Sequence, residues 1–124
     1  MDEDKLNRLP PDVKKQFIKL ASKLSEKKQK TKVHDDFLTF VKHCWPEFIE
    51  GAHHKKIAEK FNDIANKKIK RLIINMPPRH TKSEFASFLL PAWMVGRRPN
   101  LKIIQSTHTT ELAIRFGRKA KTLM

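Results

Sequence analysis

Cysteine and glycine are scarce in this chain. The single cysteine, Cys44, can form no disulfide within the chain and suits a reducing compartment. Only three glycines are present and 39% of the residues are hydrophobic, a composition that favours an ordered, helix-rich protein over a disordered one. A chain of 124 residues is long enough for one small domain with a modest core.

Long apolar runs are also missing. The longest, residues 85–96, is interrupted by Ser87 and Pro91 and falls short of the roughly 18 residues needed to cross a bilayer. The acidic residues at positions 2–4 do not resemble the start of a secretory signal. We therefore expect a cytosolic protein without a membrane partner, and we expect residues 1–9 to be frayed.

Acidic residues are few, and the net charge is +14. Ten of the 27 Lys and Arg residues lie in residues 71–124, which hold only two acidic residues. A positive field of this size favours polyanions such as nucleic acid, nucleotide phosphates or an acidic membrane surface. For the lysines of residues 1–32, a well-solvated surface explains the charge equally well.

The first 32 residues are predicted to form a basic helix or arm. Pro10, Pro11 and Asp12 are typical of a helix start. Apolar residues then recur at helical spacing, at Val13, Phe17, Leu20, Ala21 and Leu24. We expect this stripe to pack on the chain's own domain and the helix to fade within residues 26–32, which are rich in lysine.

Two more helices are predicted before residue 70. One begins at residues 34–36 and ends at Trp45, which precedes a proline; the other covers residues 53–66. Histidines 34, 43, 53 and 54 lie near Cys44 in the sequence, but their spacing matches no common zinc pattern. Surface or capping roles are favoured, and His53 and His54 are placed, as a weaker hypothesis, near a nucleotide.

Residues 71–96 carry the clearest motif. The apolar run Leu72–Met76 is typical of a buried parallel strand, and Pro77 and Pro78 stop it. Lys82-Ser83 follows, and from Ser83 a helix is predicted to about residue 95, kinked at Pro91. A strand, a tight loop ending in Lys-Ser and a helix are the layout of a phosphate-binding P-loop.

Each loop residue has a candidate role. Lys82 fits the cation that bonds the β- and γ-phosphates, and Ser83 fits the hydroxyl that ligates Mg²⁺. Arg79 adds a second positive contact, and His80 either lines the pocket or only fills the loop. However, Met76 and Thr81 occupy positions where the standard pattern has glycine, and a threonine with positive φ would cost on the order of 1–3 kcal/mol. On the pattern alone, an ordinary strand-to-helix turn competes equally with nucleotide binding.

A second strand is predicted at residues 101–105, followed by a loop at 106–110 and a last helix from about Thr110. In open α/β sheets, ligands bind at the carboxyl ends of the strands, which places residues 106–110 near the site.

The segment MPPRHTKSEF resembles the variant Walker A loop of bacteriophage terminase large subunits, the ATPases that pump DNA into procapsids. Threonine before the lysine is a known variant in that family. The resemblance extends from about residue 33 to the end of the chain. It implies that Pro78, Arg79, His80, Thr81, Lys82 and Ser83 bind ATP and Mg²⁺. It also implies double-stranded DNA, the small terminase subunit and the portal protein as partners.

The resemblance implies an α/β fold: a partial P-loop NTPase (RecA-like) domain over residues 33–124, with a helical lead-in and an incomplete sheet. Hydrolysis needs acidic residues at the end of a further strand, yet only Glu84 and Glu111 follow Ser83. We therefore assign no catalytic residue, and expect a fragment truncated before Walker B that binds nucleotide weakly without turnover. The alternatives are a fragment of another P-loop enzyme, such as a helicase or partition ATPase, a basic nucleic-acid or protein-interaction module that never binds ATP, and a truncated product without independent function.

Overall fold

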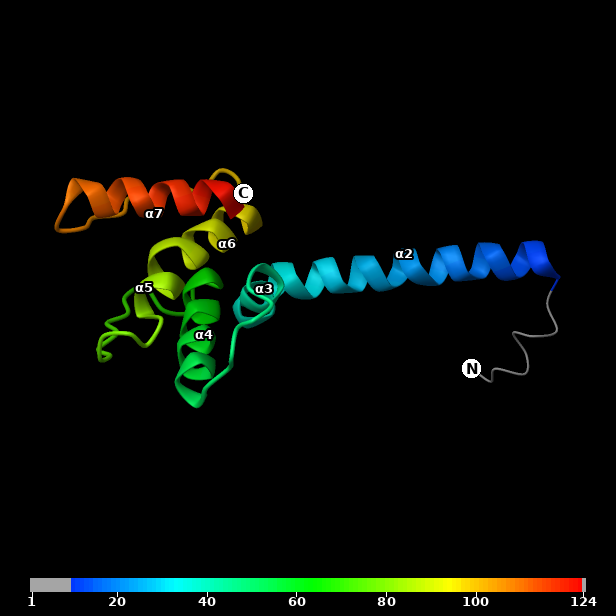
Figure 1. Cartoon of the computed structure of the whole chain (residues 1–124), viewed down its shortest axis with the longest axis horizontal. Helices are drawn as coiled ribbons and strands as arrows, with labels where there is room; N and C mark the ends of the chain where they lie inside the picture. The colour runs from blue at the N-terminus through cyan, green and yellow to red at the C-terminus, as the bar shows by residue number, and fades with distance from the viewer. Residues whose placement is uncertain (1–9, 124) are drawn as a thin grey trace. The chain divides into compact units, whose positions relative to one another are not determined.

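The computed structural model describes residues 10–123, and this part of the chain is helical (Figure 1). The expectation for residues 1–9 lies outside the described residues. The elements in chain order are α2 (Pro11–Asp35), α3 (Phe37–Cys44), α4 (Ala52–Ala65), α5 (Lys82–Glu84), the π-helical turn η1 (Phe85–Leu89), α6 (Leu90–Arg97) and α7 (Thr110–Leu123). The chain divides into two compact units, the first ending at Thr31 and the second beginning at Lys32.

The predicted α/β fold, a RecA-like P-loop domain with a sheet, is wrong, because residues 10–123 contain no strand. The segment Leu72–Met76 has no regular secondary structure and pairs with no other segment within residues 10–123. Leu72 and Ile74 pack against the core formed by the helices, whereas Ile73 between them is 85% exposed. An extended segment lying on helices alternates its side chains as a strand does, so the apolar pattern alone did not require a sheet.

The second predicted strand differs in the same way. Residues 101–105 lie beside η1 and α6 and form no ladder within the described part of the chain. Ile104 is 97% exposed. Without a sheet, the argument that placed residues 106–110 at a ligand-binding edge no longer applies.

Helix α2 is longer than the sequence predicts. It continues through the lysine-rich residues 26–32 to Asp35, and none of its residues is buried. Lys, Gln and Glu are good helix formers, so this run favours continuation over fading. Of its apolar stripe, Val13, Leu20 and Leu24 are exposed. No helix within residues 10–123 is long and apolar enough to span a membrane.

The core of the second unit is built on aromatic rings. Phe37 is fully buried and makes edge-to-face contacts with three rings, at centroid distances of 5.1 Å to Phe61, 5.5 Å to Phe85 and 5.4 Å to Trp93. This geometry is the preferred one for aromatic pairs. Through these contacts α3 holds together α4, η1 and α6.

A pair of polar residues, Asp36 and Asn62, joins the start of α3 to the last turn of α4. Asp36 caps α3, with its Oδ2 accepting from the Thr39 amide at 2.8 Å. Asn62 on α4 donates to Asp36 Oδ1 at 2.9 Å and accepts from the Phe37 amide at 3.0 Å. Burial alone would raise the pKa of Asp36, but the hydrogen bonds from Thr39 and Asn62 outweigh it and lower this pKa.

The helical run from Lys82 to Arg97 is continuous, but it widens at η1. There the Leu90 amide donates to the carbonyl of Phe85, five residues back. Pro91 follows directly. Inside a regular α-helix, a proline ring clashes with the carbonyl four residues before it, and a wider turn relieves this clash. The sequence predicts a kink at Pro91, and the structure shows a π-helical turn just ahead of it. Helix α7 packs across η1 and α6.

Candidate phosphate-binding loop

The six residues predicted to bind nucleotide form one turn between the extended segment and the helix. Pro78, Arg79, His80 and Ser83 are exposed, whereas Thr81 and Lys82 are half-buried. The turn ends at Thr81, which is the N-cap residue of α5.

Two residues of this turn have positive φ. Arg79 has φ 65° and Thr81 has φ 55°, and His80 between them is not in the positive-φ region. Where right-handed and left-handed residues alternate, successive N–H groups can point into one concavity, which is how backbone nests bind anions. Each positive-φ residue other than glycine costs on the order of 1–3 kcal/mol, and the cost is greatest for a β-branched side chain such as that of Thr81. The loop is therefore strained, as the sequence analysis allowed.

The start of the helix adds unpaired donors to the concavity. The first amide to bond within the helix is that of Phe85, which donates to the Thr81 carbonyl at 3.0 Å. The amides of Lys82, Ser83 and Glu84 come before it and have no acceptor within the helix. Amides in this position, together with the positive end of the helix dipole, favour an anion.

Lys82 folds back over the loop that precedes it. Its Nζ lies 3.4 Å from the carbonyl oxygen of Met76, so the side chain spans the turn. This single long contact leaves two ammonium protons for other acceptors. An anion seated in the turn would lie within the reach of this side chain.

Ser83 supplies one hydroxyl oxygen in the first turn of the helix. Mg²⁺ that is bound with a nucleotide takes only one or two protein oxygens, and phosphate oxygens and water complete its shell. The Ser83 hydroxyl therefore fits a ligand of a magnesium ion carried by a triphosphate, and the Lys82 ammonium fits the phosphates themselves. No group of three or more His, Cys, Asp or Glu side chains among residues 10–123 is arranged to hold a metal.

His54 is the loop contact that the sequence did not specify. This side chain is only 6% exposed and lies in the first turn of α4. Its Nδ1 accepts from the Gly51 amide at 2.9 Å, and its Nε2 lies 2.7 Å from Oγ1 of Thr81. The Thr81 hydroxyl in turn donates to the His80 carbonyl at 2.7 Å.

The surroundings of His54 disfavour its charged form. Its ring stacks on Phe85 at 5.2 Å and meets Phe48 edge-on at 4.7 Å. Burial lowers its pKa, and the neighbouring imidazoles of His53 and His80 lower it further, against a smaller opposing effect of Glu50. The imidazole is therefore held neutral near pH 7.

The sequence placed His53 and His54 near the nucleotide without giving either a partner. The available indication was the position of His54 three residues after Gly51, where a side chain can reach back to cap the helix start. The contact with Thr81 spans 27 residues and left no local pattern. His53 lies at the same face, with its ring 5.8 Å from that of His80.

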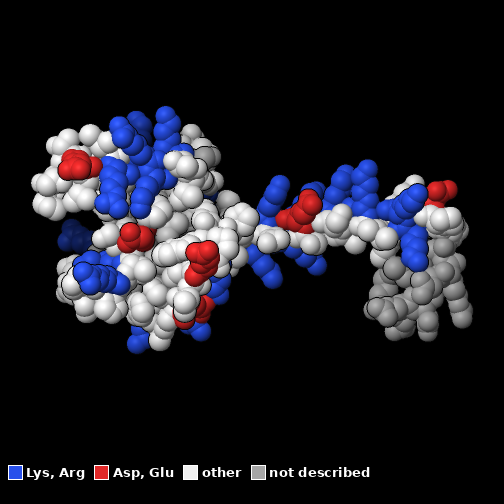
Figure 2. All heavy atoms as spheres, in the orientation of Figure 1, with Lys and Arg blue, Asp and Glu red and all other residues white. Residues whose placement is uncertain are grey.

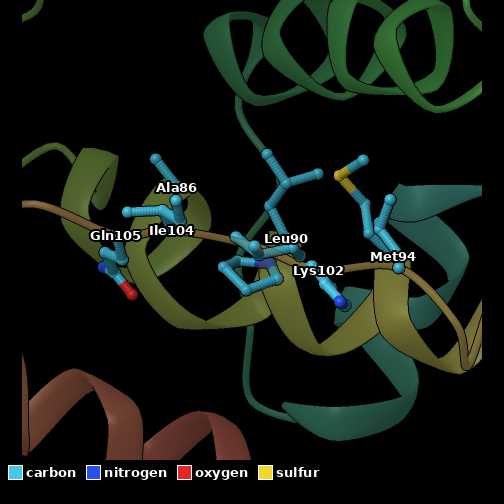
Figure 3. A pocket seen from close by; sticks show the side chains of 9 residues that line it. Ala86, Leu90, Met94, Lys102, Ile104 and Gln105 are labelled. Atoms are coloured by element: carbon cyan, nitrogen blue, oxygen red, sulfur yellow. The ribbon is translucent and has the colours of Figure 1, made fainter.

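Two hollows flank the extended segments. One, of about 380 Å³, lies between residues 101–105 and helical residues including Ala86, Leu90 and Met94 (Figure 3). The other, of about 270 Å³, lies between residues 72–76 and α4, and Lys56 and Lys60 are at its edge. Both are mainly apolar, and none of the predicted loop residues 78–83 lines either one.

Basic side chains gather over α7 and along α2 (Figure 2). On α7 they are Arg115, Arg118, Lys119 and Lys121. The positive field expected from the composition is thus displayed at the surface of each unit.

Searches of family models, curated proteins and solved structures found no match to this chain.

Proposed function

We propose that the turn of residues 78–83 binds the phosphates of ATP together with Mg²⁺, as part of a bacteriophage terminase large subunit. One observation carries the proposal. Arg79 and Thr81 both have positive φ immediately before a helix start, and the Lys82 ammonium reaches back to the Met76 carbonyl across that turn. The terminase-like sequence of the loop supports the same conclusion. The proposal concerns the turn and its helix and does not depend on a sheet.

The residues divide the work by their chemistry. The free amides at the start of α5 donate to the phosphate oxygens, and the ammonium of Lys82 exchanges the Met76 carbonyl for the β- and γ-phosphates. The Ser83 hydroxyl ligates the magnesium ion. Arg79, which is exposed, adds a second positive charge beside the phosphates, and His80 lies between the two left-handed residues.

In the full-length protein, ATP hydrolysis would drive DNA into the procapsid, and the DNA would also be cut. Double-stranded DNA, the small terminase subunit and the portal protein would be its partners, and the host cytoplasm its location. This chain alone would bind ATP weakly without hydrolysing it, because no carboxylate is assigned to activate water.

A titration with Mg·ATP, followed by calorimetry or NMR, tests the proposal. The Lys82→Ala variant should lose at least about tenfold in affinity, since a charge-assisted contact to phosphate is worth roughly 1.5–3 kcal/mol. Lys121→Ala on α7 removes the same charge from an exposed position and should leave the affinity unchanged. Steady hydrolysis by the wild-type chain that is lost in Lys82→Ala would contradict the absence of turnover.

A second candidate is a basic nucleic-acid-binding module without ATPase activity. It is favoured by the exposure of the lysines along α2 and by the basic face of α7. Such a module should bind duplex DNA with an affinity that falls steeply as salt rises, and Mg·ATP should give no signal that depends on Lys82. A fragment of another P-loop enzyme, such as a helicase, would bind ATP in the same way. A terminase and a helicase are then distinguished by whether DNA packaging depends on the full-length protein.

A further inference from the structure

We infer that His54 is a positioning residue of the phosphate-binding turn: its Nε2–H group holds Thr81 in the left-handed conformation that aims the turn's amides at phosphate. The inference rests on the proposed function, because it names a residue that holds the backbone conformation of that same site. His54 would touch neither the nucleotide nor the metal, and would act through Thr81.

The hydrogen bonds fix one tautomer of His54. A backbone amide can only donate, so the Gly51 amide requires an unprotonated Nδ1. In the neutral ring the proton is then on Nε2, which donates to Thr81 Oγ1. The Thr81 hydroxyl proton is directed to the His80 carbonyl. Every donor in this series of hydrogen bonds meets one acceptor. The opposite tautomer would place the Nδ1–H of His54 against the N–H of Gly51.

The ring is fixed in place by the core. It packs on Phe85 and Phe48, and it caps the start of α4 by accepting a hydrogen bond from the Gly51 amide. The Thr81 hydroxyl is therefore clamped between a buried ring and the carbonyl of the preceding residue. A glycine would adopt positive φ without steric strain, whereas a threonine in this conformation must be held. This contact explains how a β-branched residue occupies the position.

The conformation of Thr81 sets the direction of the groups that follow it. Its carbonyl accepts the first helical amide, from Phe85, and the free amides of Lys82 and Ser83 come next. If Thr81 left the positive-φ region, the direction of these two amides relative to the preceding turn would change. Loss of the His54 contact should therefore weaken phosphate binding while leaving the charge of the site unchanged.

Two substitutions separate the two bonds of His54. In His54→Gln the side-chain amide nitrogen can take the place of Nε2 and donate to Thr81, but the Gly51 contact is lost. In His54→Asn the shorter side chain can take the place of Nδ1 and accept from Gly51, but it cannot reach Thr81. Both variants are neutral, polar and smaller than histidine, so they disturb the packing on Phe85 and Phe48 similarly. Each therefore controls for the other.

The experiment measures three quantities for the wild type and both variants: the Kd for Mg·ATP, the melting temperature, and the NMR shifts of the Thr81 carbons. Long-range ¹H–¹⁵N spectra of the wild type also report the tautomer of His54. We expect the Nε2–H tautomer, an affinity at least about tenfold weaker in His54→Asn, an affinity within about threefold of wild type in His54→Gln, and similar melting temperatures. Thr81→Ala keeps the buried histidine and should weaken the affinity for Mg·ATP as much as His54→Asn does. The double variant of His54→Asn and Thr81→Ala should bind no more weakly than either single variant, as expected when both remove one shared contact.

Equal loss of affinity in both variants, no loss in either, or an Nδ1–H tautomer would overturn the inference. If the wild type binds no nucleotide, the proposed function fails, and the Thr81 carbon shifts decide about His54 independently. Shifts that change in His54→Asn and not in His54→Gln would support its hold on the turn, whereas the same change in both would refute it. If a variant at position 54 does not fold, Thr81→Ala removes the same contact from the side of the loop and provides the same comparison.

Discussion

Replacement of Phe37 by alanine should remove a large part of the stability of the second unit. The ring is fully buried and has three aromatic partners, Phe61, Phe85 and Trp93, which belong to three different elements. Replacing a buried phenylalanine by alanine lowers the free energy of unfolding by about 3–5 kcal/mol, and the three edge-to-face contacts favour the upper end of this range. Small domains have only about 5–15 kcal/mol in total, so Phe37→Ala should bring the fold close to its limit.

The matched control is Phe17→Ala on α2. Both phenylalanines lie in apolar stripes of similar spacing, but Phe17 is 37% exposed and no residue of its helix is buried. In thermal unfolding followed by circular dichroism, Phe37→Ala should lower the Tm by roughly 12 °C or more, at about 4–8 °C per kcal/mol, whereas Phe17→Ala should change it by no more than about 2 °C. A comparable loss in both variants would contradict the exposure of Phe17, and a small loss in Phe37→Ala would refute the aromatic core.

Two further predictions follow from the polar contacts. Asp36→Ala should cost about 0.5–2 kcal/mol in urea unfolding, because α3 loses its cap and Asn62 loses an acceptor; an unchanged midpoint would show that this contact is not formed. The pKa of His54 is lowered from its ordinary value of 6.5, with His53, His80 and Glu50 facing the ring, so the unfolded chain binds its proton more readily than the folded chain does. Stability should be full above pH 6.5 and fall as the pH decreases from there through the folded-state pKa, and His54→Gln should remove this part of the pH dependence; a decline that is identical in His54→Gln would assign it to other groups.

The helices could be predicted from the sequence because their causes are local. Apolar spacing located α3, α4, the helix after the loop and α7 to within a few residues, and Asp36 stands where a cap is expected. The sheet could not be judged in this way. Leu72 and Ile74 alternate with exposed residues, and this pattern is the same whether the segment lies against a sheet neighbour or a helix face. What separates the two cases is a distant partner segment, which periodicity does not report.

The same division applies to the loop. Strain at Thr81 could be expected from the sequence, because a β-branched residue stands where glycine is standard, and its φ of 55° agrees. The clamp by His54 could not, because it joins residues 27 positions apart through two side-chain atoms.

The most direct test of the account is the dependence of binding on phosphate and on Lys82. NMR titrations of the chain with Mg·ATP and with adenosine, each in wild type and in Lys82→Ala, separate contacts to the phosphates from contacts to the base. We predict that Mg·ATP shifts the amides of residues 79–84 in the wild type, that adenosine leaves them unchanged, and that Lys82→Ala greatly weakens the effect of Mg·ATP. Equal responses to ATP and adenosine, or a response to Mg·ATP that persists in Lys82→Ala, would contradict the assignment of this turn as a phosphate-binding site.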